Sequence, residues 1–234
     1  MTGHRWRNIM KILPMDLRAL TKVLPNSDTC VVVIDDDTEF RESLERLLRS
    51  AGLHARGFAS IAEFAKSEPP NSPTCLVLDV RMPGKSGLEF QRDLAAAGSA
   101  LPIVFITGHG DIPMTVQAMK AGAIEFLTKP FRDQDLLDAV NVGLARDRAR
   151  RENEESLNAL RARFEELTPR ERAILVEVVQ GRLNKQIAGD MGITETTVKV
   201  HRSNMMRKIE AASLPELCRM ADELNLLPKK VERL

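Results

Sequence analysis

The chain has 234 residues and a formal net charge of +1 at pH 7, which is enough length for two ordinary domains, each with its own core. Its three cysteines, Cys30, Cys75 and Cys218, are widely spaced and contain no Cys-x-x-Cys pair, which argues against a disulfide framework and against a zinc site. No apolar run approaches the roughly 18–20 residues that span a bilayer, and the first residues lack the apolar core of a signal peptide, so we expect a cytoplasmic protein.

Residues 1–28 form a predicted extension ahead of the first domain. Their apolar positions follow a loosely amphipathic pattern that Pro14 and Pro25 interrupt. Two interpretations stay open for this segment: a disordered or loosely docked extension, or a helix that contacts a membrane surface or a second copy of the chain.

Residues 29–132 alternate short apolar runs with amphipathic stretches. The apolar runs 30–34, 55–58, 75–78, 102–107 and 124–128 predict five buried strands, and the stretches between them predict helices. This alternation predicts an α/β, flavodoxin-like domain in which helices cover both faces of a parallel sheet.

Polar side chains stand where four of these strands end. Asp35 and Asp36 follow the first strand, Asp79 follows the third, Thr107 ends the fourth, and Lys129 follows the fifth. If the first and third strands are neighbours, three carboxylates share one site, and a hard divalent cation such as Mg²⁺ best relieves their repulsion. A carboxylate nucleophile beside an ammonium and a hydroxyl group has the parts for phosphoryl transfer through an aspartyl phosphate.

These residues occur as Asp35-Asp36, as Asp79 within the run Leu-Asp-Val-Arg-Met-Pro-Gly, as Thr107-Gly and as Lys129-Pro. The set resembles the receiver domain of two-component response regulators over about residues 29–132. The resemblance implies that Asp79 accepts phosphate from a sensor histidine kinase and that Lys129 pairs with the phosphoryl group, with a cis bond between Lys129 and Pro130.

The same resemblance implies a metal site and a switch. Asp36, Asp79 and the backbone carbonyl of Arg81 would ligate Mg²⁺, and Asp35 would contribute through a water molecule. Thr107 would move towards the phosphate while Phe126 turns inward. Because Phe126 has no phenol hydroxyl, we expect the switch to be one of packing.

Residues 133–166 continue the last helix of this domain into a long, polar linker helix. The segment contains no proline, and its apolar positions could pair with a copy of itself. The heptad pattern breaks between Leu144 and Leu157, so a solvated spacer helix is an equal alternative.

Residues 167–234 carry 12 basic and 9 acidic residues, and this surplus of +3 favours a polyanionic partner. Thr168-Pro169-Arg170-Glu171 predicts a capped helix start. Four short helices follow, at 172–180, 184–191, 195–209 and 214–224, and the tight turn at Gly192 between the second and third predicts a helix-turn-helix.

This tail resembles the LuxR-type helix-turn-helix of the FixJ/NarL class in the runs Leu-Thr-Pro-Arg-Glu, Asn-Lys-Gln-Ile-Ala and Thr-Thr-Val-Lys-Val-His-Arg. The resemblance implies that residues 195–208 form the recognition helix in the major groove, with some side chains at base edges and others at phosphates. A protein-binding module with a solvated basic face is the alternative. The residues expected to contact double-stranded DNA are Lys185, Thr196, Thr197, Lys199, Val200, His201, Arg202, Ser203, Arg207 and Lys208.

Together the two resemblances predict a transcriptional regulator that dimerises and binds promoter DNA when Asp79 is phosphorylated, with RNA polymerase as a further partner. Beyond its own phosphorylation and dephosphorylation, we expect no enzyme activity. Residues 105–115 and the linker most resemble regulators of aromatic-hydrocarbon (styrene/toluene-type) catabolism. Two alternatives remain: a DNA-binding regulator without phosphate control, and a Mg²⁺-dependent phosphatase, although we find neither a general acid nor a substrate lid for the latter.

Overall fold

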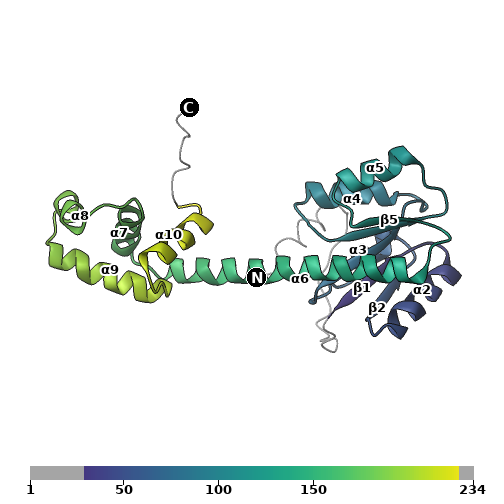
Figure 1. Cartoon of the computed structure of the whole chain (residues 1–234), viewed down its shortest axis with the longest axis horizontal. Helices are drawn as coiled ribbons and strands as arrows, with labels where there is room; N and C mark the ends of the chain where they lie inside the picture. Colours follow the sequence, from purple (N-terminus) through teal and green to yellow (C-terminus); the bar gives the residue numbers. More distant parts are fainter. Residues whose placement is uncertain (1–28, 227–234) are drawn as a thin grey trace. The chain divides into compact units, whose positions relative to one another are not determined.

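The computed structural model describes residues 29–226, and the chain divides into two compact units at Arg151 and Glu152 (Figure 1). The predicted extension, residues 1–28, lies outside the described residues, as do residues 227–234. Between residues 29 and 226, no helix has both the length and the apolar character needed to cross a membrane.

The first unit contains a five-stranded parallel sheet with the strand order β2-β1-β3-β4-β5. The prediction of a flavodoxin-like fold is therefore confirmed. In the register of β1 and β3, Ile34 is level with Leu78, so the acids that follow these two residues lie side by side at one edge of the sheet. The strands are β1 (Cys30–Ile34), β2 (Ala55–Phe58), β3 (Thr74–Asp79), β4 (Ile103–Thr107) and β5 (Glu125–Thr128).

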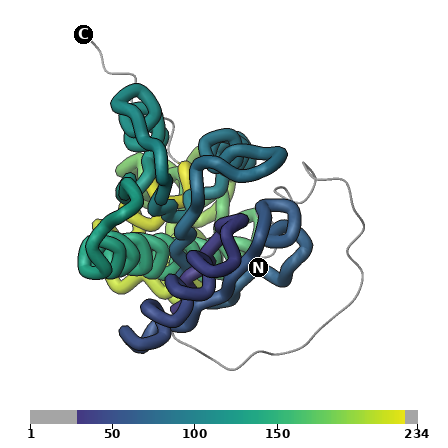
Figure 2. The backbone as a smooth tube through the Cα atoms, turned by 90° about the vertical axis from the view of Figure 1, so that its right-hand side faces the viewer, coloured from purple at the N-terminus to yellow at the C-terminus, as the bar shows by residue number. Residues whose placement is uncertain are grey.

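Helices cover both faces of this sheet because alternate strand side chains point to opposite faces. Val32 and Ile34 pack with α3 (Ile61–Lys66), α4 (Gly87–Ala96) and α5 (Ile112–Lys120). Val31 and Val33 pack with α2 (Thr38–Ser50) and with the first part of α6 (Asp133–Glu165). In Figure 2 the colour of the backbone changes from purple to teal as the chain runs through these strands and helices.

A buried carboxylate fastens α6 to the amino end of β3. Asp147 is fully buried and accepts a hydrogen bond from the backbone N–H of Thr74 at 2.8 Å. The Nε atoms of Arg150 and Arg151 also donate to Asp147, each at 2.8 Å, and Arg151 Nη2 donates to the carbonyl of Pro70 at 3.2 Å. This anchor fixes the position of α6 within the first unit.

The second unit is all-α, and its helices are α7 (Pro169–Val179), α8 (Asn184–Met191), α9 (Glu195–Ile209) and α10 (Leu214–Glu223). Val198, Met205 and Ile209 are fully buried in its core, as their spacing on α9 predicts. A tight turn joins α8 to α9, since Gly192 has a φ of 63° and Thr194 caps the next helix. The predicted helix-turn-helix is therefore present.

The capped helix start predicted at Thr168 is confirmed, but the helical run predicted from Arg172 begins too late. Helix α7 begins at Pro169, three residues before the predicted start at Arg172. The capping box of Thr168 and Glu171, with Pro169 in the first turn, starts the helix directly after Thr168.

Candidate functional site

Three acids meet at the carboxyl edge of the sheet. Asp35 directly follows β1 and is fully buried, Asp36 is exposed, and Asp79 ends β3 with only 7% of its surface exposed. One carboxylate oxygen from each of the three lies within 4.8 Å of the others. The fold thus brings together the acids that the sequence places at the tips of two different strands.

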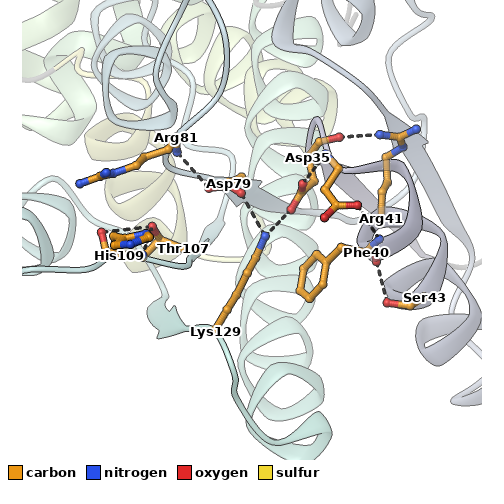
Figure 3. A network of polar contacts seen from close by, with 10 residues as sticks. Asp35, Phe40, Arg41, Ser43, Asp79, Arg81, Thr107, His109 and Lys129 are labelled. Carbon is orange, nitrogen blue, oxygen red and sulfur yellow. Dashed lines mark hydrogen bonds and ion pairs between the residues drawn. The ribbon is translucent and has the colours of Figure 1, made fainter.

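A single ammonium joins two of these acids. Lys129 directly follows β5, and its Nζ atom lies 2.7 Å from Asp35 Oδ2 and 3.0 Å from Asp79 Oδ2 (Figure 3). The backbone N–H of Lys129 donates to the carbonyl of Thr107 at 2.7 Å, and the bond between Lys129 and Pro130 is cis, as expected. Residues from three strand tips therefore form one polar cluster.

Burial has the largest effect on the pKa values in this cluster. Burial raises the pKa of the Asp35 carboxyl, and hydrogen bonds from Lys129 and from the backbone of Asp37 offset this only in part, while the charge of Asp79 raises the pKa further. Burial lowers the pKa of Lys129, but its hydrogen bonds to Asp35 and Asp79 outweigh this and raise it overall. Three carboxylates beside one ammonium leave an excess of negative charge.

This donor set fits a hard divalent cation. Mg²⁺ takes oxygen ligands and is usually bound through one or two carboxylates, with water or phosphate oxygens completing its shell. Asp79 and exposed Asp36 offer such oxygens, and Arg81 is held beside them because its backbone N–H donates to Asp79 Oδ1 at 2.9 Å. The pocket is acidic in the way that binding of such a cation requires.

The two predicted switch residues lie on β4 and β5, where Thr107 ends β4 and Phe126 precedes Lys129 by three residues. The hydroxyl of Thr107 donates to the carbonyl of His109 at 3.3 Å and accepts from its N–H at 3.2 Å, so it is engaged within its own loop. Phe126 is 9% exposed, and its ring centroid lies 6.1 Å from that of Phe105. Phe126 therefore already faces inward in this structure, and its movement stays a prediction.

Sequence reasoning missed three residues around Asp35. The backbone N–H of Asp37 donates to Asp35 Oδ1 at 2.9 Å, and Arg41 Nη1 donates to the Asp35 carbonyl at 2.6 Å. The ring of Phe40 lies 3.8 Å from Lys129 Nζ, measured to its centroid. The helical pattern of α2 assigns Phe40 only to an apolar face, because nothing local to residues 38–50 indicates that Lys129 will lie against it.

The second candidate site is the surface of α8 and α9. The predicted DNA contacts Lys185, Thr196, Lys199, Val200, Ser203 and Arg207 are exposed. Val200 is 54% exposed although it is apolar, and Lys199 is within 3.5 Å of Glu195 one turn earlier. An exposed basic and small-residue face on the second helix of a helix-turn-helix is suited to the major groove.

The remaining predicted contacts are half-buried, and Thr197, Arg202 and Lys208 have side-chain partners within the unit. Arg202 Nη1 lies 3.2 Å from Asn184 Oδ1, and the hydroxyls of Thr197 and Thr194 are 2.8 Å apart. Lys208 Nζ lies 2.8 Å from Glu171 Oε2, and Glu171 is only 3% exposed. Phosphate binding by Lys208 would compete with this pair, so its role at DNA stays a prediction, as do those of Arg202, Thr197 and His201.

Known proteins match both units. Residues 31–141 match the family described as "Response regulator receiver domain", and residues 165–221 match "Bacterial regulatory proteins, luxR family". Nodulation protein W of Bradyrhizobium diazoefficiens is 49% identical over 203 residues, which cover 87% of this chain and 89% of that protein. The response regulator protein TmoT of Ectopseudomonas mendocina is 45% identical over 85% of this chain and 90% of its own length.

Solved structures are similar over the same length. The response regulator StyR shares 50% sequence identity with a TM-score of 0.76, and the match covers 84% of this chain and 100% of that one. Full-length FixJ from B. japonicum shares 38% identity with a TM-score of 0.51, over 87% of this chain and 100% of its own.

Proposed function

The chain belongs to the response regulators of two-component systems that join a receiver domain to a LuxR-type DNA-binding domain, and from this premise we propose that phosphorylation of Asp79 controls DNA binding. The family resemblance that the sequence indicates is confirmed. The observation that carries the proposal is the position of Lys129 Nζ, 2.7 Å from Asp35 and 3.0 Å from Asp79.

In the proposed reaction, a carboxylate oxygen of Asp79 attacks the phosphorus of a phosphohistidine on the sensor kinase. A P–O bond to Asp79 forms, the P–N bond breaks, and the histidine leaves with the electron pair. Lys129 then neutralises charge on a phosphoryl oxygen. Asp36, Asp79 and the carbonyl of Arg81 would hold Mg²⁺, with Asp35 acting through water, and the ion supplies positive charge at the same oxygens when bound.

The phosphoryl group would reach the rest of the unit through Thr107. Its hydroxyl now bonds the backbone of His109, and we propose that it exchanges this partner for a phosphoryl oxygen. Gly110 lies against Phe126, because a side-chain carbon at Gly110 would come within 2.9 Å of the Phe126 ring. Movement of the loop that contains Thr107 and Gly110 would therefore change the packing of Phe126. Such a switch needs no phenol hydroxyl.

The proposal also includes the domain boundaries, the oligomeric state and the partners of the protein. Residues 29–132 would form the receiver domain behind an extension of residues 1–28, residues 133–166 its last helix and linker, and residues 167–234 the DNA-binding domain. Phosphorylation would promote a homodimer whose paired recognition helices bind promoter DNA beside RNA polymerase in the cytoplasm. The only reactions of the protein itself would be phosphorylation and dephosphorylation of Asp79.

The proposal is tested by measuring phosphate uptake and DNA affinity on the same samples. A double-stranded sequence selected from a random library by the acetyl-phosphate-treated protein serves as the probe. We expect treatment to raise affinity by about tenfold or more, within the usual range for coupling between two sites, and Asp79→Asn to show neither uptake nor increase. Equal affinity of Asp79→Ala and phosphoprotein would instead support control without phosphate. Repeated turnover of a phosphate ester would support a phosphatase.

A further inference from the structure

The ammonium of Lys129 has a third neighbour besides its two carboxylates. The ring of Phe40, on the first turn of α2, lies with its centroid 3.8 Å from Lys129 Nζ. Figure 3 shows this ring beside the lysine side chain, next to the hydrogen bonds from its Nζ atom to Asp35 and Asp79. A cation this close to an aromatic face is attracted by the negative charge of that face, most strongly where water is excluded. The Lys129 side chain is only 20% exposed, so most of it is shielded from water.

The ring is fixed from two directions. The backbone N–H of Phe40 donates to the capping carboxylate of Asp37 at 3.1 Å, and the N–H of Asp37 donates to Asp35 Oδ1 at 2.9 Å. The edge of Phe131 packs against the ring at a centroid distance of 6.1 Å and an interplanar angle of 85°. Phe131 follows Lys129 by two residues, so the loop that carries the ammonium also braces the ring.

From this arrangement we propose that Phe40 is a positioning residue for phosphoryl transfer, which holds the Lys129 ammonium at Asp79 by a cation–π contact. The inference rests on the proposed function. A lysine ammonium is a mobile charge on a flexible four-carbon stem, and only a fixed charge stabilises the transition state without reorganisation. The aromatic face restricts the ammonium to the side of the pocket where the phosphoryl oxygens arrive.

The test changes the charge on the face of the ring without changing its shape. Phenylalanines with one, two or three fluorine atoms are incorporated at position 40 of the full chain, and the rate of phosphorylation by acetyl phosphate is measured in Mg²⁺. Each fluorine withdraws electron density from the face and weakens the cation–π contact. We expect the rate to fall stepwise, by about three- to tenfold for the trifluorinated ring.

Phe164 provides a matched control, because its ring also lies near a cation, with the Arg172 guanidinium carbon 5.1 Å from its centroid. The same fluorination at position 164 in the second unit should leave the phosphorylation rate unchanged. Phe40→Leu keeps an apolar side chain without an aromatic face and should be as slow as the trifluorinated protein, whereas Phe40→Tyr should restore the rate. Thermal unfolding of each protein identifies any loss of folding.

Two outcomes would overturn the inference, and they can be told apart. If the wild type accepts phosphate on Asp79 but the rate is the same for all fluorinated rings at position 40, Phe40 does not position Lys129. If the wild type accepts no phosphate on Asp79, the proposed function fails first and the inference falls with it.

Discussion

The two ends of β3 present buried carboxylates in opposite surroundings. At the carboxyl end, Asp79 lies beside Asp35 and Asp36, and Lys129 is the ammonium that pairs with the buried two. At the amino end, Asp147 of α6 is fully buried between the guanidinium groups of two arginines and the backbone N–H of Thr74. Negative charge is in excess at the first site, whereas at the second two guanidinium groups pair with one carboxylate.

This difference separates a reactive site from a structural anchor. A buried charge that has lost its water needs compensation by opposite charge and hydrogen bonds. Asp147 obtains that compensation within the chain and has no need of a ligand. The acids around Asp79 lack such compensation, so a bound cation, alone or together with a phosphoryl group, can supply the positive charge that they need.

The largest effect is expected at the anchor. Asp147→Ala leaves two arginines and the N–H of Thr74 without their carboxylate, and removal of one partner of a buried pair costs about 3 kcal/mol of unfolding free energy. Urea unfolding measures this loss. Asp93→Ala serves as the control, since its partner Lys85 is a third exposed, and should cost less than about 1 kcal/mol. A loss at Asp147 no larger than at Asp93 would contradict the account of the anchor.

Mg²⁺ should stabilise the folded protein by binding at Asp79 and not at Asp147. At a concentration of ten times its dissociation constant, a ligand of the folded state adds about 1.4 kcal/mol to the free energy of unfolding. We expect a gain of this size for the wild type and for Asp147→Asn, and none for Asp79→Asn. Thermal unfolding with Mg²⁺ and after its removal with a chelator makes the comparison. A gain that survives in Asp79→Asn would place the ion elsewhere.

Neutralising each carboxylate should change stability in opposite directions when no Mg²⁺ is present. Asp79→Asn removes one of three crowded negative charges while Lys129 keeps its pair with Asp35, so we expect a gain of about 1 kcal/mol. Asp147→Asn should instead lose stability. Urea unfolding in a chelator measures both variants, and a loss in both would show that charge balance does not distinguish the two sites.

Glu171 in the second unit is a third site for the comparison, because this buried carboxylate pairs with a single ammonium, that of Lys208. Burial raises the pKa of Glu171, but the hydrogen bonds from Lys208 and Thr168 outweigh this and hold the pKa below its ordinary value of 4.5. The folded state therefore binds fewer protons than the unfolded state. Its contribution is present above about pH 4.5 and is lost as the pH falls through the lowered pKa.

Replacing the Glu171 carboxylate tests whether its pKa is lowered in the folded state. At pH 7, Glu171→Gln should reduce the free energy of unfolding by about 1 kcal/mol, because the amide is a weaker partner for Lys208. The difference between wild type and variant should shrink as the pH is lowered below 4.5. Parallel urea titrations at several pH values measure it, and a difference that grows in acid would mean that the shift has the opposite sign.

The reactive end of β3 could be predicted from the sequence, and the anchored end could not. Short apolar runs that end in Asp35, Asp79, Thr107 and Lys129 define strand tips, and the parallel alternation brings those tips to one edge. The capping pairs at Ser60, Thr168 and Ser213 are equally local, because each cap and its partner are three residues apart.

The anchor depends on contacts between distant positions. Asp147 meets Thr74 across 73 residues, and the pattern around Arg150 and Arg151 is that of a solvated linker. Phe40 and Lys129, and likewise Glu171 and Lys208, meet only after the chain has folded. In each case the residue types were visible, but their partners were set by the packing of elements that the local pattern does not place.

The central claim is that Asp79 accepts a phosphoryl group with the help of a divalent cation. Its most direct test is mass spectrometry of the full chain after treatment with acetyl phosphate. We predict one phosphoryl group per chain, on the peptide that carries Asp79, in Mg²⁺ and none after chelation. A phosphoryl group on another residue, or uptake that persists in Asp79→Asn or in the chelator, would contradict the account.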